Sequence, residues 1–153
     1  MEPYQSIGWT AARLARQLEV ALATVELSSA QYRMLVQLAQ GSEASTPLAR
    51  KLAVSAPSVT TVVDGLVQRG AVERTYSAED RRRVSLALTE IGQGLLVSAE
   101  DAVRGRLESI ANELEDEGLA GNAIRALALW GEALDRARIR RHSLQREAEV
   151  VAP

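Results

Sequence analysis

Three consecutive arginines are the residues with the clearest chemical potential in this chain. Arg81 and Arg82 follow Asp80 in a polar stretch, 77–82, whose composition favours a turn, and Arg83 comes directly after that stretch. A guanidinium donates paired hydrogen bonds to phosphate or carboxylate oxygens, and a nearby carboxylate can fix its orientation. A single arginine is by default a solvated surface residue. Three together at the tip of a predicted hairpin weaken that interpretation and favour contact with an anionic partner.

A second set of candidate residues lies in a helix predicted for residues 55–69. Ser55 is a favourable N-cap, Pro57 is tolerated in a first helical turn, and Gly70 suits the left-handed residue that ends a helix. The apolar residues recur at helical spacing as one stripe: Val59, Val62, Val63 and Leu66. The opposite side carries small or polar residues: Ser58, Thr61, Asp64, Gly65 and Gln68. One face therefore packs, and the other is available to a partner.

The segments around this helix predict a winged helix-turn-helix. Residues 46–52 form a second short capped helix, and only Ala53 and Val54 separate it from the next cap, so the turn is tight. Residues 71–76 and 83–88 alternate in polarity as half-buried strands do. The pattern predicts a winged helix-turn-helix module over residues 28–89, in a mainly α fold with a small antiparallel β-hairpin.

The chain that leads into this module is also expected to be helical. Residues 7–25 place apolar side chains at alternating spacings of four and three, which is typical of a helix that packs on another helix. Ser28 or Ser29 is the expected N-cap of a further helix that Gly41 closes. Residues 42–45 are expected to form a polar link.

Two long helices are predicted after the module, at about 89–115 with Thr89 as N-cap and at about 123–141. Together with the first helix they hold more apolar surface than one winged module can bury. We expect residues 1–27 and 90–145 to form a homodimerisation region, with residues 146–153 as a disordered tail. An intramolecular helical bundle is the alternative.

Composition excludes several classes of protein. The chain of 153 residues has no cysteine, and His142 is its only histidine, so thiolate or histidine-rich metal sites are not expected. No apolar run approaches the ~18 residues of a membrane helix, and no signal-peptide pattern opens the chain. We expect a soluble cytoplasmic protein without a cofactor or a metal. No nucleophile paired with a base and no phosphate-binding glycine loop is present, so an enzyme is not expected.

Charge is unevenly distributed along the chain. The formal net charge is −2, yet residues 46–83 hold seven Lys and Arg against four acids, and residues 136–146 hold five arginines and no acid. Positive charge is therefore concentrated in the predicted winged module and near the C-terminus. The C-terminal arginines suit either DNA flanks or ion pairs with acidic residues of a partner subunit.

Five segments, in this order, resemble the MarR family of bacterial transcriptional regulators. They are Leu27–Leu35, Leu48–Leu52, Val54–Leu66, Gly70–Arg74 and Asp80–Gly92. The most specific is the last, in which Asp80-x-Arg82 runs into a strand that ends in Leu-Thr-Glu-x-Gly. A helix-turn-helix alone is common, but this order of segments is not.

The resemblance implies that helix 55–69 enters the major groove of double-stranded DNA and that Arg82 reaches the minor groove. The candidate major-groove residues are Ser55, Pro57, Ser58, Thr60 and Thr61, and the candidate wing residues are Arg74, Asp80, Arg81, Arg82 and Arg83. Short side chains can touch base edges, and a guanidinium suits a narrow, electronegative groove. Thr60 lies beside the packed stripe, so packing is its alternative role. Thr61 and Gly65 occupy positions where many members are basic, so we expect the wing arginines and dimerisation to dominate affinity.

The resemblance also implies a homodimeric repressor of palindromic operators that a small aromatic or amphipathic ligand releases from DNA. Candidate ligand-binding residues are Trp9, Tyr32 and Trp130, although aromatic residues on helices more often belong to the core. The competing hypothesis is a winged-helix module that binds another protein and not DNA. Arg81–Arg83 argue against that hypothesis.

Overall fold

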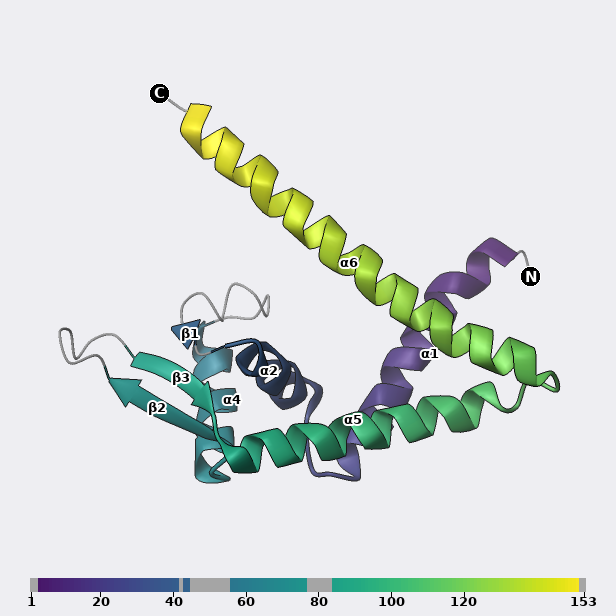
Figure 1. Cartoon of the computed structure of the whole chain (residues 1–153), viewed down its shortest axis with the longest axis horizontal. Helices are drawn as coiled ribbons and strands as arrows, with labels where there is room; N and C mark the ends of the chain where they lie inside the picture. Colours follow the sequence, from purple (N-terminus) through teal and green to yellow (C-terminus); the bar gives the residue numbers. More distant parts are fainter. Residues whose placement is uncertain (1–2, 42, 45–55, 77–83, 152–153) are drawn as a thin grey trace. The chain divides into compact units, whose positions relative to one another are not determined.

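The computed structural model describes residues 3–41, 43–44, 56–76 and 84–151 (Figure 1). The chain divides into two compact units, residues 1–106 and residues 107–153. The first unit holds helices α1, α2 and α4, a small sheet and most of helix α5, and the second holds the end of α5 and helix α6. The mainly helical fold with a small antiparallel hairpin is as predicted.

The first two helices are joined by a tight corner. Helix α1 spans Pro3–Ala23 and α2 spans Ser29–Ala39. After α1, the amide of Leu27 donates to the carbonyl of Leu22 at 3.0 Å, and Glu26 has a left-handed φ of 56°. This is the geometry in which glycine usually ends a helix. Ser28 is the N-cap of α2, in a reciprocal capping box with Gln31, which confirms one of the two predicted caps.

Helix α4 spans Ala56–Gln68 and packs as its apolar spacing predicts. Val59, Val63 and Leu66 are buried. Gly70 follows with φ of 70°, and the amide of Ala71 donates to the carbonyl of Leu66 at 2.9 Å. The predicted left-handed end of the helix is therefore confirmed. The expected N-cap, Ser55, and the expected helix at 46–52 lie outside the described residues.

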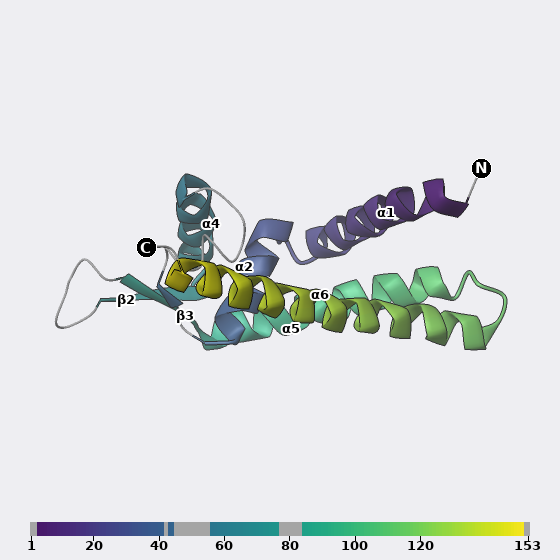
Figure 2. The same ribbon diagram turned by 90° about the horizontal axis from the view of Figure 1, so that it is seen from above.

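The sheet has three antiparallel strands in the order β1-β3-β2. Strand β1 is Glu43–Ala44, β2 is Val72–Tyr76 and β3 is Val84–Leu88. The hairpin is confirmed, with Val72 opposite Leu88 and Tyr76 opposite Val84. The polar link expected at 42–45 was partly wrong, because Glu43 and Ala44 pair with Leu86 and Ser85 of β3. The hairpin projects beyond α2 and α4 in both views (Figure 1, Figure 2).

The last two helices differ in extent from the sequence-based prediction. Helix α5 spans Glu90–Ala111, and α6 spans Glu117–Val151. The expected bounds of 123–141 were too narrow for α6. The carboxylate of Asp116 accepts hydrogen bonds from the amides of Gly118 at 2.7 Å and Leu119 at 3.3 Å, so the helix begins before its glycines. Residues 142–151 contain neither glycine nor proline, and the helix continues through them to Val151.

One hydrophobic core holds the first unit together. It draws buried side chains from α1, α2, α4, the hairpin and α5, and these include Leu22, Leu35, Leu66, Val72, Leu86 and Ala99. The exposed side of α4 and the two wing strands are thereby fixed on one packed body.

Candidate nucleic-acid interface

The exposed side of α4 is the surface on which the predicted major-groove residues lie. Thr60 and Thr61 are exposed, as are Asp64 and Gln68 one and two turns further along the helix. Pro57 and Ser58 belong to the first turns of α4, and Ser55 lies outside the described residues. The side of α4 opposite the buried valines therefore presents short polar side chains at its N-terminal half.

An ion pair joins this side of α4 to the wing. The Arg74 guanidinium on β2 donates a hydrogen bond from Nη2 to Oδ1 of Asp64. Arg74 lies two residues from buried Val72 on β2, so its side chain points to the same side of the strand, which is the side that packs against α4. The Arg74 side chain is 33% exposed and that of Asp64 is 57% exposed. Arg74 therefore connects the wing to α4 through Asp64.

A hydrogen bond also fixes the C-terminal end of α4. Arg69 Nη1 donates to the carbonyl oxygen of Glu26 at 2.6 Å. Because Glu26 forms the corner between α1 and α2, this bond connects the last turn of α4 to the end of the first helix. With the ion pair of Asp64, α4 is held at two points outside its apolar stripe.

The base of the wing is closed by the Leu-Thr-Glu-x-Gly segment. Thr89 Oγ1 donates to the carbonyl of Gly70 at 2.6 Å and accepts from the amide of Gly92 at 3.1 Å. The amide of Thr89 donates to the carbonyl of Ala71 at 3.1 Å. Thr89 is therefore the N-cap of α5, as predicted, and also joins α5 to the turn that precedes β2. A Cβ atom on Gly92 would collide with the carbonyl oxygen of Ala71 and would lie 2.6 Å from Leu88 Cδ1.

The wing-tip residues Asp80, Arg81, Arg82 and Arg83 lie outside the described residues. Their roles in binding stay predictions. The strands on either side of them are in register to their ends, because Tyr76 of β2 pairs with Val84 of β3.

The three aromatic residues predicted to bind a ligand occupy different environments. Tyr32 is partly buried against the core, and its hydroxyl donates to Oε1 of Glu100 on α5 at 2.7 Å. Burial, the hydrogen bond and the charge of Glu100 raise the pKa of Tyr32 well above its usual range. Trp9 on α1 is 65% exposed and Trp130 on α6 is 67% exposed. Their role in ligand binding stays a prediction.

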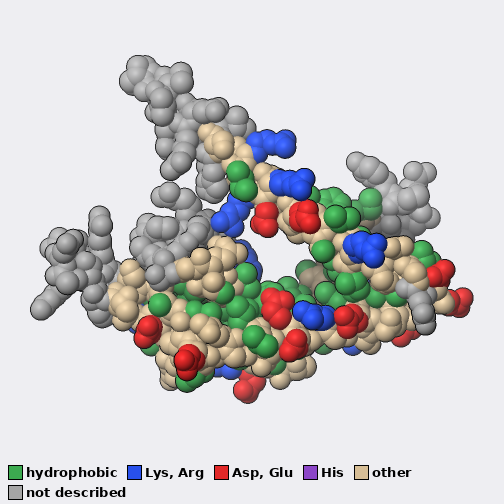
Figure 3. Space-filling model, viewed as in Figure 1, with side chains coloured by type: hydrophobic (Ala, Val, Ile, Leu, Met, Phe, Trp, Pro, Cys, Tyr) green, Lys and Arg blue, Asp and Glu red, His purple; other side chains and the backbone are tan. Residues whose placement is uncertain are grey.

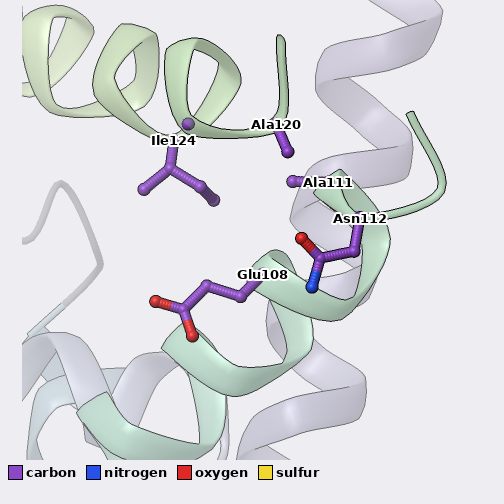
Figure 4. Close-up of a pocket in the computed structure, with 6 residues that line it drawn as sticks. Glu108, Ala111, Asn112, Ala120 and Ile124 are labelled. Atoms are coloured by element: carbon purple, nitrogen blue, oxygen red, sulfur yellow. The ribbon is translucent and has the colours of Figure 1, made fainter. Parts of the chain in front are cut away.

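A separate open pocket lies within the second unit, where the end of α5 faces the start of α6. Its volume is about 380 Å³. Glu108 of α5 and Asn112, which directly follows α5, face Ile124 and Ala120 of α6 across it (Figure 4). None of the predicted aromatic residues lines it. In the part of the chain that the structure describes, no cluster of three or more His, Cys, Asp or Glu residues could hold a metal ion.

Asp64 is the interface residue that sequence reasoning did not single out. It belongs to the exposed stripe predicted for α4, but nothing local assigned it a partner ten residues away. The available signal was a charged residue, Arg74, at a strand position whose parity places it on the packed face. Such a charge requires a partner nearby.

The capped helix α4, its exposed polar side and the antiparallel hairpin beside it define a winged-helix protein. Residues 27–84 match the model of the MarR family. Among the described residues, no helix is long and apolar enough to span a lipid bilayer.

Similar proteins agree with this match. The chain is 29% identical over 93 residues to the HTH-type transcriptional repressor YetL of Bacillus subtilis, which covers 59% of this chain and 54% of that protein. It spans about half the length of the curated relatives it matches. The apo form of MarR from E. coli has a TM-score of 0.70 at 21% identity, over 84% of this chain and 95% of that chain. The transcriptional repressor CouR bound to a 23-mer DNA duplex has a TM-score of 0.65 at 28% identity, over 82% and 89%.

Proposed function

We propose that this chain is a sequence-specific transcriptional regulator that binds double-stranded DNA. The exposed polar side of α4 enters the major groove, and the β2–β3 wing lies along the adjacent minor groove. The observation that carries this proposal is the pair of bonds that fix α4, from Asp64 to Arg74 of the wing and from Arg69 to Glu26. They hold a helix without cationic residues on its described N-terminal half in one orientation to the hairpin. The DNA-bound state of CouR, the structural relative with 28% identity, supports the same use of the fold.

A homodimer is the second part of the proposal. Helix α1 exposes Ile7 and Trp9, and α6 exposes Leu127, Trp130 and Leu134 at spacings of three and four. Figure 3 shows hydrophobic side chains along α6 between arginines. Exposed apolar surface of this extent on a soluble chain marks an interaction surface. Two copies related by a two-fold axis would place two α4 helices on half-sites about 34 Å apart.

Repression with release by a ligand is the third part. YetL is named a transcriptional repressor, as is CouR in its DNA complex. The bond from Tyr32 to Glu100 joins α2 to α5, and a small aromatic or amphipathic molecule that inserts beside Tyr32 would compete with it. A thermal-shift screen with aromatic carboxylic acids, followed by DNA binding with each stabilising compound, tests this part separately.

The central test is selection of DNA by the purified protein from a random-sequence pool, followed by mapping of its genomic binding sites. We expect a palindrome with half-sites one helical turn apart. Arg82→Ala should weaken binding to the selected duplex by at least roughly tenfold and leave the oligomeric state unchanged. Arg104→Ala, at an exposed arginine of α5, is the matched control and should bind as the wild type does. Recovery of no enriched sequence would contradict the proposed function.

A further inference from the structure

The charge of Asp64 is unexpected at its position. Its carboxylate lies one turn from Thr60 and Thr61 on the exposed side of α4, with the side chain 57% exposed. If that side enters a groove, a lone carboxylate there would repel the phosphates on either side of it. On electrostatic grounds alone, Asp64 lowers the affinity for DNA.

The position of Arg74 suggests why a carboxylate is present. Arg74 leaves β2 on the face that packs on α4, beside Val72 in the buried core. Without a partner, its long side chain would have many rotamers at the edge of the core. The bond from Nη2 to Asp64 selects one of them. A guanidinium has five N–H donors, so those not used by Asp64 can bind a second anion.

We propose that Asp64 is a positioning residue for DNA binding: it holds the Arg74 guanidinium between α4 and the wing, where Arg74 binds a backbone phosphate. This inference rests on the proposed function, because it assigns a role within the same interface. The pair converts a flexible cation into an oriented one, so less conformational entropy is lost on binding. Asp64 contributes through Arg74 and makes no contact with DNA.

The proposal and simple electrostatics predict opposite orders of affinity. If Asp64 only repels DNA, Asp64→Ala should bind more tightly than the wild type, and Asp64→Glu should bind equally well. If Asp64 positions Arg74, Asp64→Ala should bind roughly tenfold more weakly. Asp64→Glu should recover most of that loss, because the exposed site has room for a longer carboxylate that can reach the guanidinium again.

Coupling between the two residues is tested with Arg74→Ala and the double variant. Arg74→Ala should weaken binding to a similar degree and lower the slope of log affinity against log salt by about one. Asp64→Ala should lower the slope in the same direction. The double variant should bind no more weakly than Arg74→Ala, since Asp64 has no role once the guanidinium is absent.

A matched control separates positioning from general charge and from stability. Glu73→Gln removes an exposed carboxylate from the same strand, on the face opposite Arg74, and should leave affinity unchanged or slightly raised. The charge-swapped variant, Asp64→Arg with Arg74→Asp, should regain the stability to urea that the single variants lose, but should not regain DNA affinity. If the ion pair had only a structural role, the swapped variant would regain both stability and DNA affinity.

The experiment uses full-length protein and the duplex that the wild type selects from the random pool, with fluorescence anisotropy at several salt concentrations. Weaker binding by Asp64→Ala, rescue by Asp64→Glu and a reduced salt slope support the proposal. Equal or tighter binding by Asp64→Ala overturns it, and so does a slope that Asp64→Ala leaves unchanged. A wild-type protein that binds no duplex refutes instead the proposed function.

Discussion

At the scale of single residues, Tyr32 combines burial with a charged acceptor. Its hydroxyl donates to Glu100 at 2.7 Å, and desolvation is the main reason why its pKa is raised, followed by the bond and the charge of Glu100. The phenolate would lose the hydrogen bond and would face a carboxylate of like charge. The neutral phenol is therefore the form that the folded protein stabilises.

This environment predicts an alkaline limit to stability. The folded pKa of Tyr32 lies above the value of about 10 in an unfolded chain, so the unfolded state releases its proton first as the pH rises. The contribution of Tyr32 is complete below about pH 10 and is lost as the pH increases further. Urea unfolding from pH 8 to 11.5 should show a steeper loss of stability for the wild type than for Tyr32→Phe.

Glu100→Gln tests whether burial or the charge of Glu100 contributes more to the raised pKa of Tyr32. The amide keeps an acceptor but removes the charge, so the phenol of Tyr32 should still titrate above its usual pKa, although less far. Absorbance of the phenolate at alkaline pH, as the difference between each protein and its Tyr32→Phe counterpart, measures this. A Tyr32 that titrates like a free tyrosine in Glu100→Gln would show that burial is not the main cause.

At the scale of secondary-structure elements, the corner between β3 and α5 has the strictest steric requirement. Gly92 lies against the Ala71 carbonyl and Leu88, while Thr89 bonds to Gly70 and Ala71. Only hydrogen fits at the α carbon of residue 92. The last glycine of the Leu-Thr-Glu-x-Gly segment is therefore explained by the close approach of α5 to the turn before β2.

Gly92→Ala should lower the free energy of unfolding by about 2 to 3 kcal/mol, because backbone atoms must move to admit the methyl group. Gly94→Ala, two residues further along α5, is the matched control. A Cβ there meets nothing within 4 Å, so the gain in helix propensity should raise stability by up to about 1 kcal/mol. Chemical denaturation of both variants measures the difference. Equal stabilities of the two variants would contradict the steric argument.

The elements that sequence could predict are those whose signals are local. The stripe of Val59, Val63 and Leu66 and the cap at Ser28 depend on neighbours within a few residues. Strand β1 was missed because two residues have no periodicity, and it exists only through pairing with β3. The early start of α6 was missed because its glycines suggested a break, which the Asp116 cap overrides.

The candidate site also combines features that local sequence signals predict with features that depend on tertiary packing. Helical spacing was enough to place Thr61 on the exposed side of α4, but it left Thr60 between exposure and packing. The partner of Arg74 depends on how β2 lies against α4, and therefore on tertiary packing that no short sequence window contains. The sequence analysis named Arg74 as a wing residue but did not anticipate Asp64 as its partner.

At the scale of the whole molecule, the question is what covers the apolar side of α6. Leu127, Trp130 and Leu134 follow the spacing of a helix-packing seam, yet Trp130 is 67% and Leu134 64% exposed. Full burial of such side chains stabilises an assembly by roughly 1.5 to 3 kcal/mol each. A two-fold interface repeats every contact. A second copy that covers this seam would therefore bury these side chains on both protomers.

The variant Trp130→Glu with Leu134→Glu should therefore be monomeric at concentrations where the wild type is a dimer, since two charges in each seam cannot be buried without partners. Arg125→Glu, on the opposite side of α6, is the control and should remain dimeric. Sedimentation velocity measures both. A dimer binds both half-sites of a palindrome at once, so the monomeric variant should lose most of its affinity for the palindrome. On a duplex with a single half-site, the variant and the wild type should bind equally. A wild-type protein that sediments as a monomer would indicate that α6 is covered within its own chain, as in the alternative helical bundle.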